Sequence, residues 1–336
     1  MRSLITGIGG FAGSYLAEEL LASGSEEVWG VVRHDPGHAH HLSGKVHLVS
    51  ADLTDPERVR AVLAEVRPDR IYHLAGQSFV GAAWRDPWPT FETNIRAQLN
   101  VLEAMVQLGL EARILVVGSQ DEYGKVGPAE LPIKESTLLR PNNPYGVSKV
   151  AQDLLGLQYY YGYGVHAVRV RPFNHVGPRQ SDRFVVPAFA RQIAEVEAGL
   201  REPVIYVGNL ESARDFCDVR DVVRAYRLLL ERGTAGEVYN VGSGRAYSIR
   251  TLLSLLLDMS RVEIRVEQDP DRLRPSDIPI SFADISRIRA AIDWEPNIPF
   301  ETSVRDVLDY WRARVRESSE RHVDGFRLNE DGDRHG

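Results

Sequence analysis

Short apolar runs alternate with amphipathic stretches along the first 170 residues. The stretch after Pro56, for example, places Val59, Val62, Leu63 and Val66 at the spacing of one helix face. Six apolar runs predict strands, at residues 2–6, 28–32, 46–50, 70–75, 113–117 and 165–170. Strands that alternate with helices at this rhythm predict an α/β fold, in which a parallel sheet carries helices on both faces.

The rhythm loosens after residue 170. Further elements are predicted there, with helices at 184–200, 218–230 and 249–257 and strands at 204–207, 238–241 and 262–266. We therefore expect a doubly wound parallel-sheet domain over residues 1–170 and a smaller C-terminal α/β lobe over residues 171–316 that mainly binds substrate. Residues 317–336 are highly charged and without periodicity, which is typical of a mobile tail.

Composition narrows the class of protein. The 336 residues are 43% hydrophobic, which supports a sizeable core, and the net charge of −7 disfavours general nucleic-acid binding. Cys217 is the single cysteine, so the sequence predicts no disulfide framework and no cysteine metal cage. A strand and a glycine loop begin at once, and no apolar run approaches the ~20 residues that span a bilayer. A soluble, cytoplasmic protein is expected.

A glycine loop follows the first predicted strand and precedes a predicted helix. Gly7, Gly10 and Gly13 have the spacing G-x-x-G-x-x-G, and Phe11 follows the second glycine. In this setting backbone N–H groups can approach a pyrophosphate, and the helix N-terminus favours its negative charge. The loop therefore predicts a dinucleotide site in a Rossmann-type sheet.

The second predicted strand ends in Arg33 and His34, where an acidic residue would bind the adenosine ribose hydroxyls. An arginine there suits a ribose 2′-phosphate, so NADP is favoured as the cofactor. Asp35 lies close enough to keep NAD possible. The histidines at 34, 38, 40 and 41 lie in a stretch typical of a surface loop, without a suitably spaced carboxylate or cysteine, and no metal site is predicted.

A second candidate site combines a phenol, an ammonium and a hydroxyl. Tyr145 and Lys149 are four residues apart at the start of a predicted helix and so share one face. We expect the cation to lower the pKa of the tyrosine, which can then exchange a proton with a sugar oxygen. Ser119 follows the fifth strand and can hydrogen-bond the same oxygen, or only cap its own turn. Asp121 is either a general base or a solvated turn carboxylate, and the same alternatives hold for Glu122.

Arginines recur in the predicted loops of the C-terminal lobe. Arg179, Arg214, Arg272 and Arg274 all fall there. Because arginine forks suit phosphate oxygens, they predict a substrate that carries a diphosphate.

Several motifs together resemble the extended short-chain dehydrogenases/reductases, from residue 2 to about 316. They are Gly7-x-x-Gly10-x-x-Gly13, Asp52-Leu53, His73-Leu74-Ala75, Ser119 and Tyr145-x-x-x-Lys149. The resemblance implies an NAD(P)-dependent enzyme with Ser119, Tyr145, Lys149 and Asp121 at its catalytic centre. It also implies a set of cofactor-binding residues: Gly7, Gly10, Phe11, Gly13, Arg33, Asp52, Leu53, Leu74, Ala75, Tyr145 and Lys149.

Within that family, segments 118–124, 171–175, 208–215 and 272–277 are most similar to enzymes of GDP-linked 6-deoxyhexoses. One group reduces GDP-4-dehydro-6-deoxy-D-mannose to GDP-D-rhamnose, and the other comprises the GDP-mannose 4,6-dehydratases. In the dehydratases this loop resembles Thr-Ser-Glu. In this chain Ser119 matches the threonine and Asp121 matches the glutamate. Phe11-Ala12 in the glycine loop and the single Arg33 also depart from the dehydratase pattern.

These departures favour the reductase, in which Tyr145 protonates the C4 oxygen and Ser119 orients it. The resemblance implies substrate contacts from Ser119, Asn174, Arg179, Arg214, Arg274 and Asp277. A dehydratase, with Asp121 or Glu122 as the C5 base, is the alternative enzyme, and a non-catalytic nucleotide sensor is the alternative of another class. A homodimer through helices 94–108 and 145–161 is also implied, with the tyrosines at 159–161 either at the contact or in the core.

Overall fold

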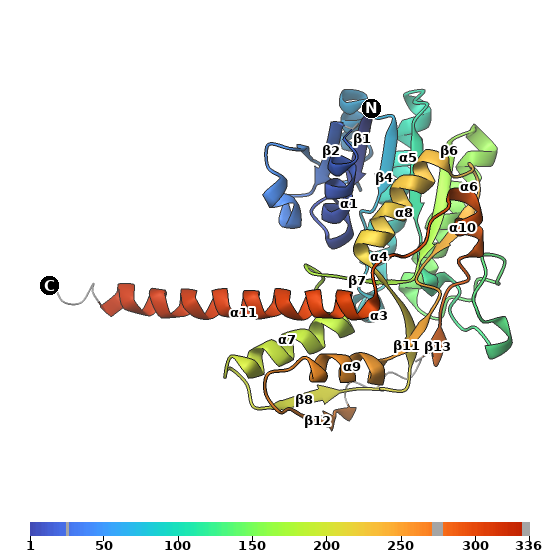
Figure 1. Ribbon diagram of the computed structural model, residues 1–336. Helices are drawn as coiled ribbons and strands as arrows, with labels where there is room; N and C mark the ends of the chain where they lie inside the picture. The colour runs from blue at the N-terminus through green and yellow to red at the C-terminus, as the bar shows by residue number, and fades with distance from the viewer. Residues whose placement is uncertain (25–26, 271–277, 331–336) are drawn as a thin grey trace. The chain divides into compact units, whose positions relative to one another are not determined.

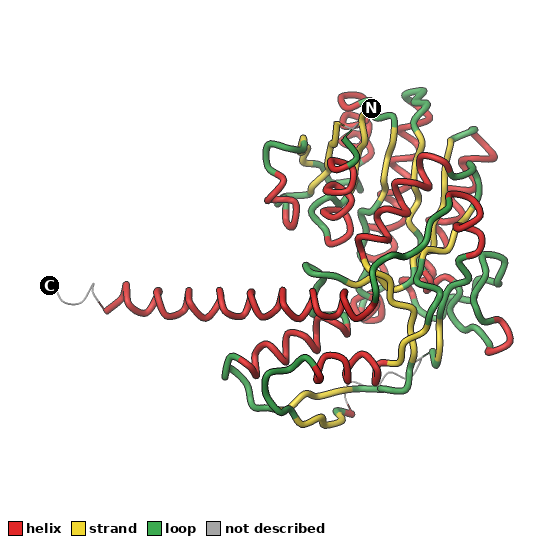
Figure 2. The backbone as a smooth tube through the Cα atoms, viewed as in Figure 1, coloured by secondary structure: helices red, strands yellow, loops and turns green. Residues whose placement is uncertain are grey.

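The computed structural model describes residues 1–24, 27–270 and 278–330, with side chains described as far as residue 320. The chain forms two units, each made of segments that are separate in sequence. The first comprises Met1–His175, Ala213–Ala246 and Ile278–Ile298, and the second comprises Val176–Ser212, Tyr247–Asp277 and Pro299–Gly336. Figure 1 labels the elements of both units, and Figure 2 shows their helices and strands along the backbone.

A seven-stranded sheet forms the centre of the first unit, in the order β10-β6-β5-β4-β1-β2-β3. Every pairing in it is parallel. The strands are β1 (Arg2–Thr6), β2 (Glu27–Val32), β3 (His47–Ser50), β4 (Arg70–His73), β5 (Arg113–Val117), β6 (His166–Pro172) and β10 (Val238–Val241). The predicted α/β fold with a parallel sheet is confirmed.

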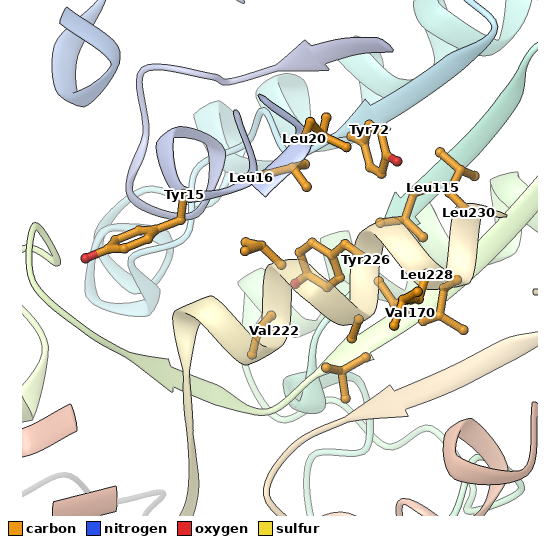
Figure 3. Close-up of a cluster of buried hydrophobic side chains, with 14 of the residues drawn as sticks. Tyr15, Leu16, Leu20, Tyr72, Leu115, Val170, Val222, Tyr226, Leu228 and Leu230 are labelled. Carbon is orange, nitrogen blue, oxygen red and sulfur yellow. The ribbon is translucent and has the colours of Figure 1, made fainter. Parts of the chain in front are cut away.

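Adjacent strand residues point to opposite faces of the sheet, and two hydrophobic clusters divide accordingly. One cluster joins Ile5, Tyr72 and Leu115 of the sheet to α1 (Phe11–Ala22) and α8 (Val219–Arg232). Figure 3 shows Tyr72 and Leu115 in this cluster, with Leu20 of α1 and Leu230 of α8. The neighbouring residues Leu4, Ile71 and Ile114 lie in the other cluster, with residues of three further helices. Those helices are α2 (Pro56–Val66), α5 (Ala97–Gln107) and α6 (Pro144–Tyr163). Because both faces are covered, the inner strands carry neighbouring apolar residues that face opposite sides, such as Ile114 and Leu115 of β5.

Shorter elements of the first unit follow the strand ends or lie beside the main sheet. They are η1 (Gly37–Leu42), α3 (Val80–Arg85), α4 (Trp88–Phe91), the π-helical η2 (Glu92–Arg96), η3 (Gln120–Glu122), η4 (Pro128–Glu130), β9 (Ala213–Asp218), β13 (Ile280–Ser281) and α10 (Ser286–Ile292). Strands β7 (Asn174–Val176) and β11 (Ala246–Ser248) run across the division between the units.

The second unit is smaller. It contains α7 (Val185–Glu197), β8 (Val204–Val207), α9 (Ile249–Asp258), β12 (Arg265–Gln268) and α11 (Phe300–Glu330). Strands β8 and β12 pair in parallel, and Arg312 of α11 binds Glu197 of α7 with an N–O distance of 2.7 Å. None of the helices in the described part of the chain is long and apolar enough to cross a membrane.

The division into units and the charged C-terminal stretch differ from the sequence prediction. The chain returns to the first unit after residue 212, where β10 pairs with β6 at the edge of the main sheet. A single boundary at residue 170 is therefore replaced by several crossings, because a parallel strand can be supplied by any later segment. The charged stretch predicted to be a mobile tail from residue 317 continues α11 as far as Glu330.

Candidate active site

The glycine loop between β1 and α1 lies where the central strands end. Gly7 has a φ of 75°, and a Cβ there would lie 2.9 Å from the backbone of Ala75. A Cβ on Gly13 would lie 2.2 Å from the carbonyl oxygen of Gly7. Side chains are therefore excluded at both positions, which leaves a backbone cradle at the N-terminus of α1.

An open pocket of about 270 Å³ adjoins this cradle. Gly7, Gly10, Arg33, Asp52, Leu53 and Ala75, all predicted to bind the cofactor, are among the residues that line it. The loop glycines, a polar pair at the rim and an apolar wall suit the adenosine and pyrophosphate parts of a dinucleotide. Phe11, Gly13, Leu74, Tyr145 and Lys149 are not part of this lining.

The polar rim of the pocket carries one exposed cation. Arg33 Nη2 lies 2.7 Å from Asp52 Oδ2, and hydrogen bonds from Thr54 and Arg33 lower the pKa of Asp52 to about 2. The Asp35 carboxylate instead accepts the N–H of Gly37 at 2.5 Å and so closes a turn. Arg33 keeps 64% of its side chain exposed, against 40% for Asp52.

The N-terminus of α6 brings the predicted phenol and ammonium together. Asn143 caps the helix by accepting the Gly146 N–H at 2.7 Å, and Pro144 occupies the first turn. Tyr145 and Lys149 are both buried, and Lys149 Nζ lies 5.8 Å from the Tyr145 ring centroid. Nζ donates a hydrogen bond to the carbonyl oxygen at the end of β5, Val117 O, at 2.9 Å.

The prediction that Lys149 lowers the pKa of Tyr145 is wrong for this structure. Burial and the negative charge of Asp121 raise the pKa of Tyr145, and a hydrogen bond with Ser119 only partly opposes them. Burial also lowers the pKa of Lys149 to about 8. The sequence showed the spacing of the pair but not its burial, which has the largest effect on the pKa of Tyr145.

Ser119 and Asp121 form a hydrogen-bonded loop against the α6 cap. Ser119 Oγ donates to Asp121 Oδ2 at 3.2 Å and accepts the Asp121 N–H at 3.1 Å. Asn143 Nδ2 donates to Asp121 Oδ1 at 3.1 Å. Both carboxylate oxygens of Asp121 are thus engaged from the protein side.

Glu122 is the other carboxylate that the sequence left open as a base. Its side chain is fully buried, and Oε1 accepts the Ser119 N–H at 2.7 Å. A carboxyl that faces the protein interior cannot remove a proton from a bound sugar. Glu122 therefore belongs to the support of the loop and not to its reactive face.

The predicted substrate residues are only partly brought together. Asn174 lies beside the Ser119 loop, because Gln120 Nε2 donates to its Oδ1 at 3.2 Å. Arg214, on β9 of the first unit, donates to Ile278 O at 2.6 Å. Arg179 belongs to the second unit and has a φ of 74°. Arg274 and Asp277 lie outside the described residues.

Sequence reasoning missed three polar side chains that organise this region. Asn143 and Gln120 hold Asp121 and Asn174, as described above. Asn94, in the π-helical turn η2, accepts the Gln77 N–H at 2.7 Å and donates to Ser148 at 2.9 Å. The Asn-Pro pair before Tyr145 is a recognisable cap signal, but neither Gln120 nor Asn94 stands in a pattern that predicts its partner.

Histidines in and near the site are engaged in ways that do not suggest a metal. His73 is buried against Thr6 with its pKa lowered to about 3, and the His175 ring stacks on Phe11 at 5.8 Å between centroids. His41 lies 2.5 Å from Glu18. Among the residues that the structure describes, no group of three or more histidine, cysteine or acidic side chains is arranged to hold a metal ion.

Comparisons with known proteins agree with this geometry. The profile of the family described as GDP-mannose 4,6 dehydratase matches residues 4–307. The chain is 39% identical to the GDP-6-deoxy-D-mannose reductase of Pseudomonas aeruginosa, over 94% of this chain and 99% of the relative. It is 30% identical to a GDP-mannose 4,6-dehydratase of Vibrio cholerae, over 91% and 92%. The solved structure of RMD from Pseudomonas aeruginosa complexed with NADPH has a TM-score of 0.82 at 37% identity, over 93% and 99% of the two chains.

Proposed function

The chain belongs to the GDP-mannose 4,6-dehydratase family of extended short-chain dehydrogenases/reductases, and we propose that within this family it is a reductase. Its substrate is GDP-4-dehydro-6-deoxy-D-mannose, its product is GDP-D-rhamnose, and NADPH is the reductant. The identity to a relative named GDP-6-deoxy-D-mannose reductase, over nearly the full length of both chains, supports this assignment.

The observation that carries the proposal is the engagement of Asp121. Dehydration needs a free carboxylate at this position to take the C5 proton, as the resemblance implies for the dehydratases. Here the side chain is one methylene shorter, and its two oxygens are bound by Ser119 and Asn143. Reduction of a ketone needs no such base.

The raised pKa of Tyr145 points the same way. A phenol that stays protonated at neutral pH is loaded as an acid, which is what a reduction demands of it. In the reverse direction the reaction would begin from the phenolate, which burial and Asp121 disfavour.

When bound, NADPH supplies the hydride that the C4 carbonyl carbon accepts. Tyr145 gives its proton to the C4 oxygen as negative charge develops there. Ser119 holds that oxygen within reach of the phenol, and Lys149 supplies a positive charge that limits the cost of the resulting phenolate. Asp121 keeps the Ser119 hydroxyl in one orientation.

NADP is favoured over NAD by the rim of the pocket. One carboxylate oxygen of Asp35 accepts the Gly37 N–H, which leaves only the other for a ribose hydroxyl. Arg33 faces solvent with a planar group suited to a 2′-phosphate. Binding of the GDP moiety is assigned to Asn174, Arg179, Arg214, Arg274 and Asp277, by similarity to the family.

A homodimer through α5 and α6 is part of the proposal. Val147, Leu154 and Tyr161 recur every seven residues along α6 and are 45%, 50% and 77% exposed, whereas Tyr159 is buried. This apolar stripe suits a helix–helix contact with a second copy. Tyr161→Arg should convert a dimer to monomers in sedimentation velocity experiments. A cytoplasmic location stays a prediction.

Two assays test the reaction. Incubation with NADPH and GDP-4-dehydro-6-deoxy-D-mannose should oxidise NADPH and form product at ~1:1 stoichiometry. The absorbance of the reduced cofactor measures the oxidation. Incubation with GDP-mannose and NADP should give no 4-keto sugar. Formation of a 4-keto product without net change of cofactor would show a dehydratase instead, which the relatives of that name keep as the second candidate.

A further inference from the structure

Glu122 is a buried carboxyl with no part in the mechanism above. It ends the short helix η3, has no exposed surface, and reaches back to accept the Ser119 N–H at 2.7 Å. The Ser119 side chain in turn accepts the N–H of Asp121, so the two ends of this turn cap one another. Two carboxyls thus hold Ser119: Glu122 accepts its backbone N–H, and Asp121 accepts its hydroxyl hydrogen.

The fit around Glu122 leaves it no alternative position. A Cβ on Gly118 would lie 2.1 Å from Glu122 Oε1, so a glycine is required where the carboxyl turns back. The second oxygen, Oε2, lies 3.0 Å from Arg171 Nε. That Nε–H donates to Asp153 at 3.1 Å, and Oε2 accepts no hydrogen bond from the described residues.

Charged groups reach Glu122 from both elements packed behind the loop. Arg171 comes from β6, and Asp153 and Lys149 come from α6, where Asp153 also binds Arg169 at 2.8 Å. Burial and Asp153 raise the pKa of Glu122, while Arg171 and Lys149 oppose that shift. In turn, the charge of Glu122 raises the pKa of both Lys149 and Tyr145.

We propose that Glu122 is a positioning residue for the reduction: its carboxyl anchors the Ser119 backbone and ties the hydroxyl-bearing loop to the Arg171 side chain. Through the anchor, Ser119 keeps its place beside the Tyr145 phenol. When ionised, Glu122 also raises the pKa of Lys149, in a site whose burial favours loss of that proton. The inference rests on the proposed reductase function, because Ser119 acts there on the C4 oxygen.

Two substitutions separate the anchor from the charge. Glu122→Gln keeps an oxygen for the Ser119 N–H and removes the charge, whereas Glu122→Leu removes both. Arg171 keeps Asp153 as its partner in either variant, so neither leaves it unpaired. Glu130→Gln is the matched control, because Glu130 also ends a short helix and accepts a backbone N–H, from Gly127 at 2.8 Å, but is partly exposed and outside the site.

The measurement is the pH profile of NADPH oxidation with the 4-keto sugar nucleotide, with kcat and KM separated. Glu122→Leu should lower kcat about 10- to 100-fold with the KM for NADPH within about twofold of wild type. Glu122→Gln should keep kcat at neutral pH within about threefold, and its alkaline limb should move to lower pH, because Lys149 loses its proton more readily. Glu130→Gln should match wild type throughout.

A Glu122→Leu variant with wild-type kcat would overturn the proposal, as would equal losses in the leucine and glutamine variants. Amide hydrogen exchange of the 118–123 segment gives a readout that needs no substrate. Exchange at Ser119 should be faster in Glu122→Leu than in wild type or Glu122→Gln, and unchanged exchange would contradict the anchor. If wild type fails to reduce the 4-keto sugar, the reductase function falls, while the exchange result still decides whether Glu122 anchors the loop.

Discussion

The two ends of the site solve different physical problems. At the glycine loop, the contacts offered are backbone N–H groups and a pair of exposed charges, Arg33 and Asp52. At the α6 end, Tyr145, Lys149 and Glu122 are buried. Lys149 donates to the carbonyl oxygen of Val117, and Glu122 accepts the Ser119 N–H. The glycine-loop end is open and suits a charged ligand, whereas the α6 end consists of buried ionisable groups.

The difference indicates which kinetic constant each end controls. Exposed charges in water contribute about 1 kcal/mol or less, so changes at the rim should alter binding modestly. Buried ionisable groups have shifted pKa values, so changes there should alter the chemical step of the proposed reduction. Four predictions follow this division, from the largest expected effect to the smallest.

Tyr145→Phe should lower kcat by about 10²- to 10⁴-fold, because the C4 oxygen loses its proton donor. The dissociation constant for NADPH, measured by fluorescence titration, should stay within about threefold of wild type. Tyr163→Phe, an exposed position near the end of the same helix, is the control and should have wild-type kcat. A Tyr145→Phe enzyme with undiminished kcat would remove the phenol from the mechanism.

Gly13→Ala should weaken NADPH binding by at least about 10-fold, since the added Cβ would lie 2.2 Å from Gly7 O and must displace the loop. Isothermal titration calorimetry measures the affinity, and the thermal midpoint reports any loss of stability. Gly162→Ala, on an exposed turn of α6, should leave both values unchanged or raise the midpoint slightly. Equal affinities for Gly13→Ala and wild type would mean that the pyrophosphate lies elsewhere.

The turnover of the wild-type enzyme should fall as the pH rises through about 8. Burial lowers the pKa of Lys149 to that value, so the side chain is charged below it and neutral above it. The loss follows because a neutral Lys149 no longer offsets the charge of the phenolate. A profile of kcat/KM between pH 6 and 10 measures the limb. A flat profile up to pH 10 would contradict the buried, weakened ammonium.

Arg33→Ala should raise the KM for NADPH about 10-fold and change the KM for NADH by less than about twofold, which corresponds to about 1.4 kcal/mol for one phosphate contact. Arg60→Ala removes another exposed arginine that is paired with a carboxylate, at 2.6 Å, and serves as the control. Steady-state kinetics with each cofactor provides the comparison. Equal effects of Arg33→Ala on both cofactors would place the 2′-phosphate away from this rim.

The sequence was most informative where function depends on local geometry. The spacing of Gly7 and Gly13 predicted the cradle, because close approach of backbones requires glycine whatever surrounds it. The four-residue separation of Tyr145 and Lys149 predicted that they share a helix face, because helix periodicity is local. The wall residues Asp52 and Ala75 followed from the family motifs, and the pocket contains both.

The sequence was least informative where function depends on partners from distant segments. Nothing local indicates that Asn143 binds Asp121, 22 residues earlier, or that Gln120 binds Asn174. The boundary at residue 170 missed β10 for the same reason, since a parallel sheet accepts strands regardless of their order along the chain.

By itself, then, the sequence determined the α/β architecture, the glycine cradle and the pairing of Tyr145 with Lys149 on one helix face. The reason is that hydrophobic periodicity, steric exclusion and helical spacing each operate over a few residues. The tertiary structure decided the protonation of that pair and the orientation of the carboxylates around it. Desolvation depends on everything that surrounds a group, and it raised the pKa of Tyr145 where proximity of charge alone predicted a decrease. The tertiary structure also buries Glu122, whose carboxyl accepts the Ser119 N–H and faces the protein interior.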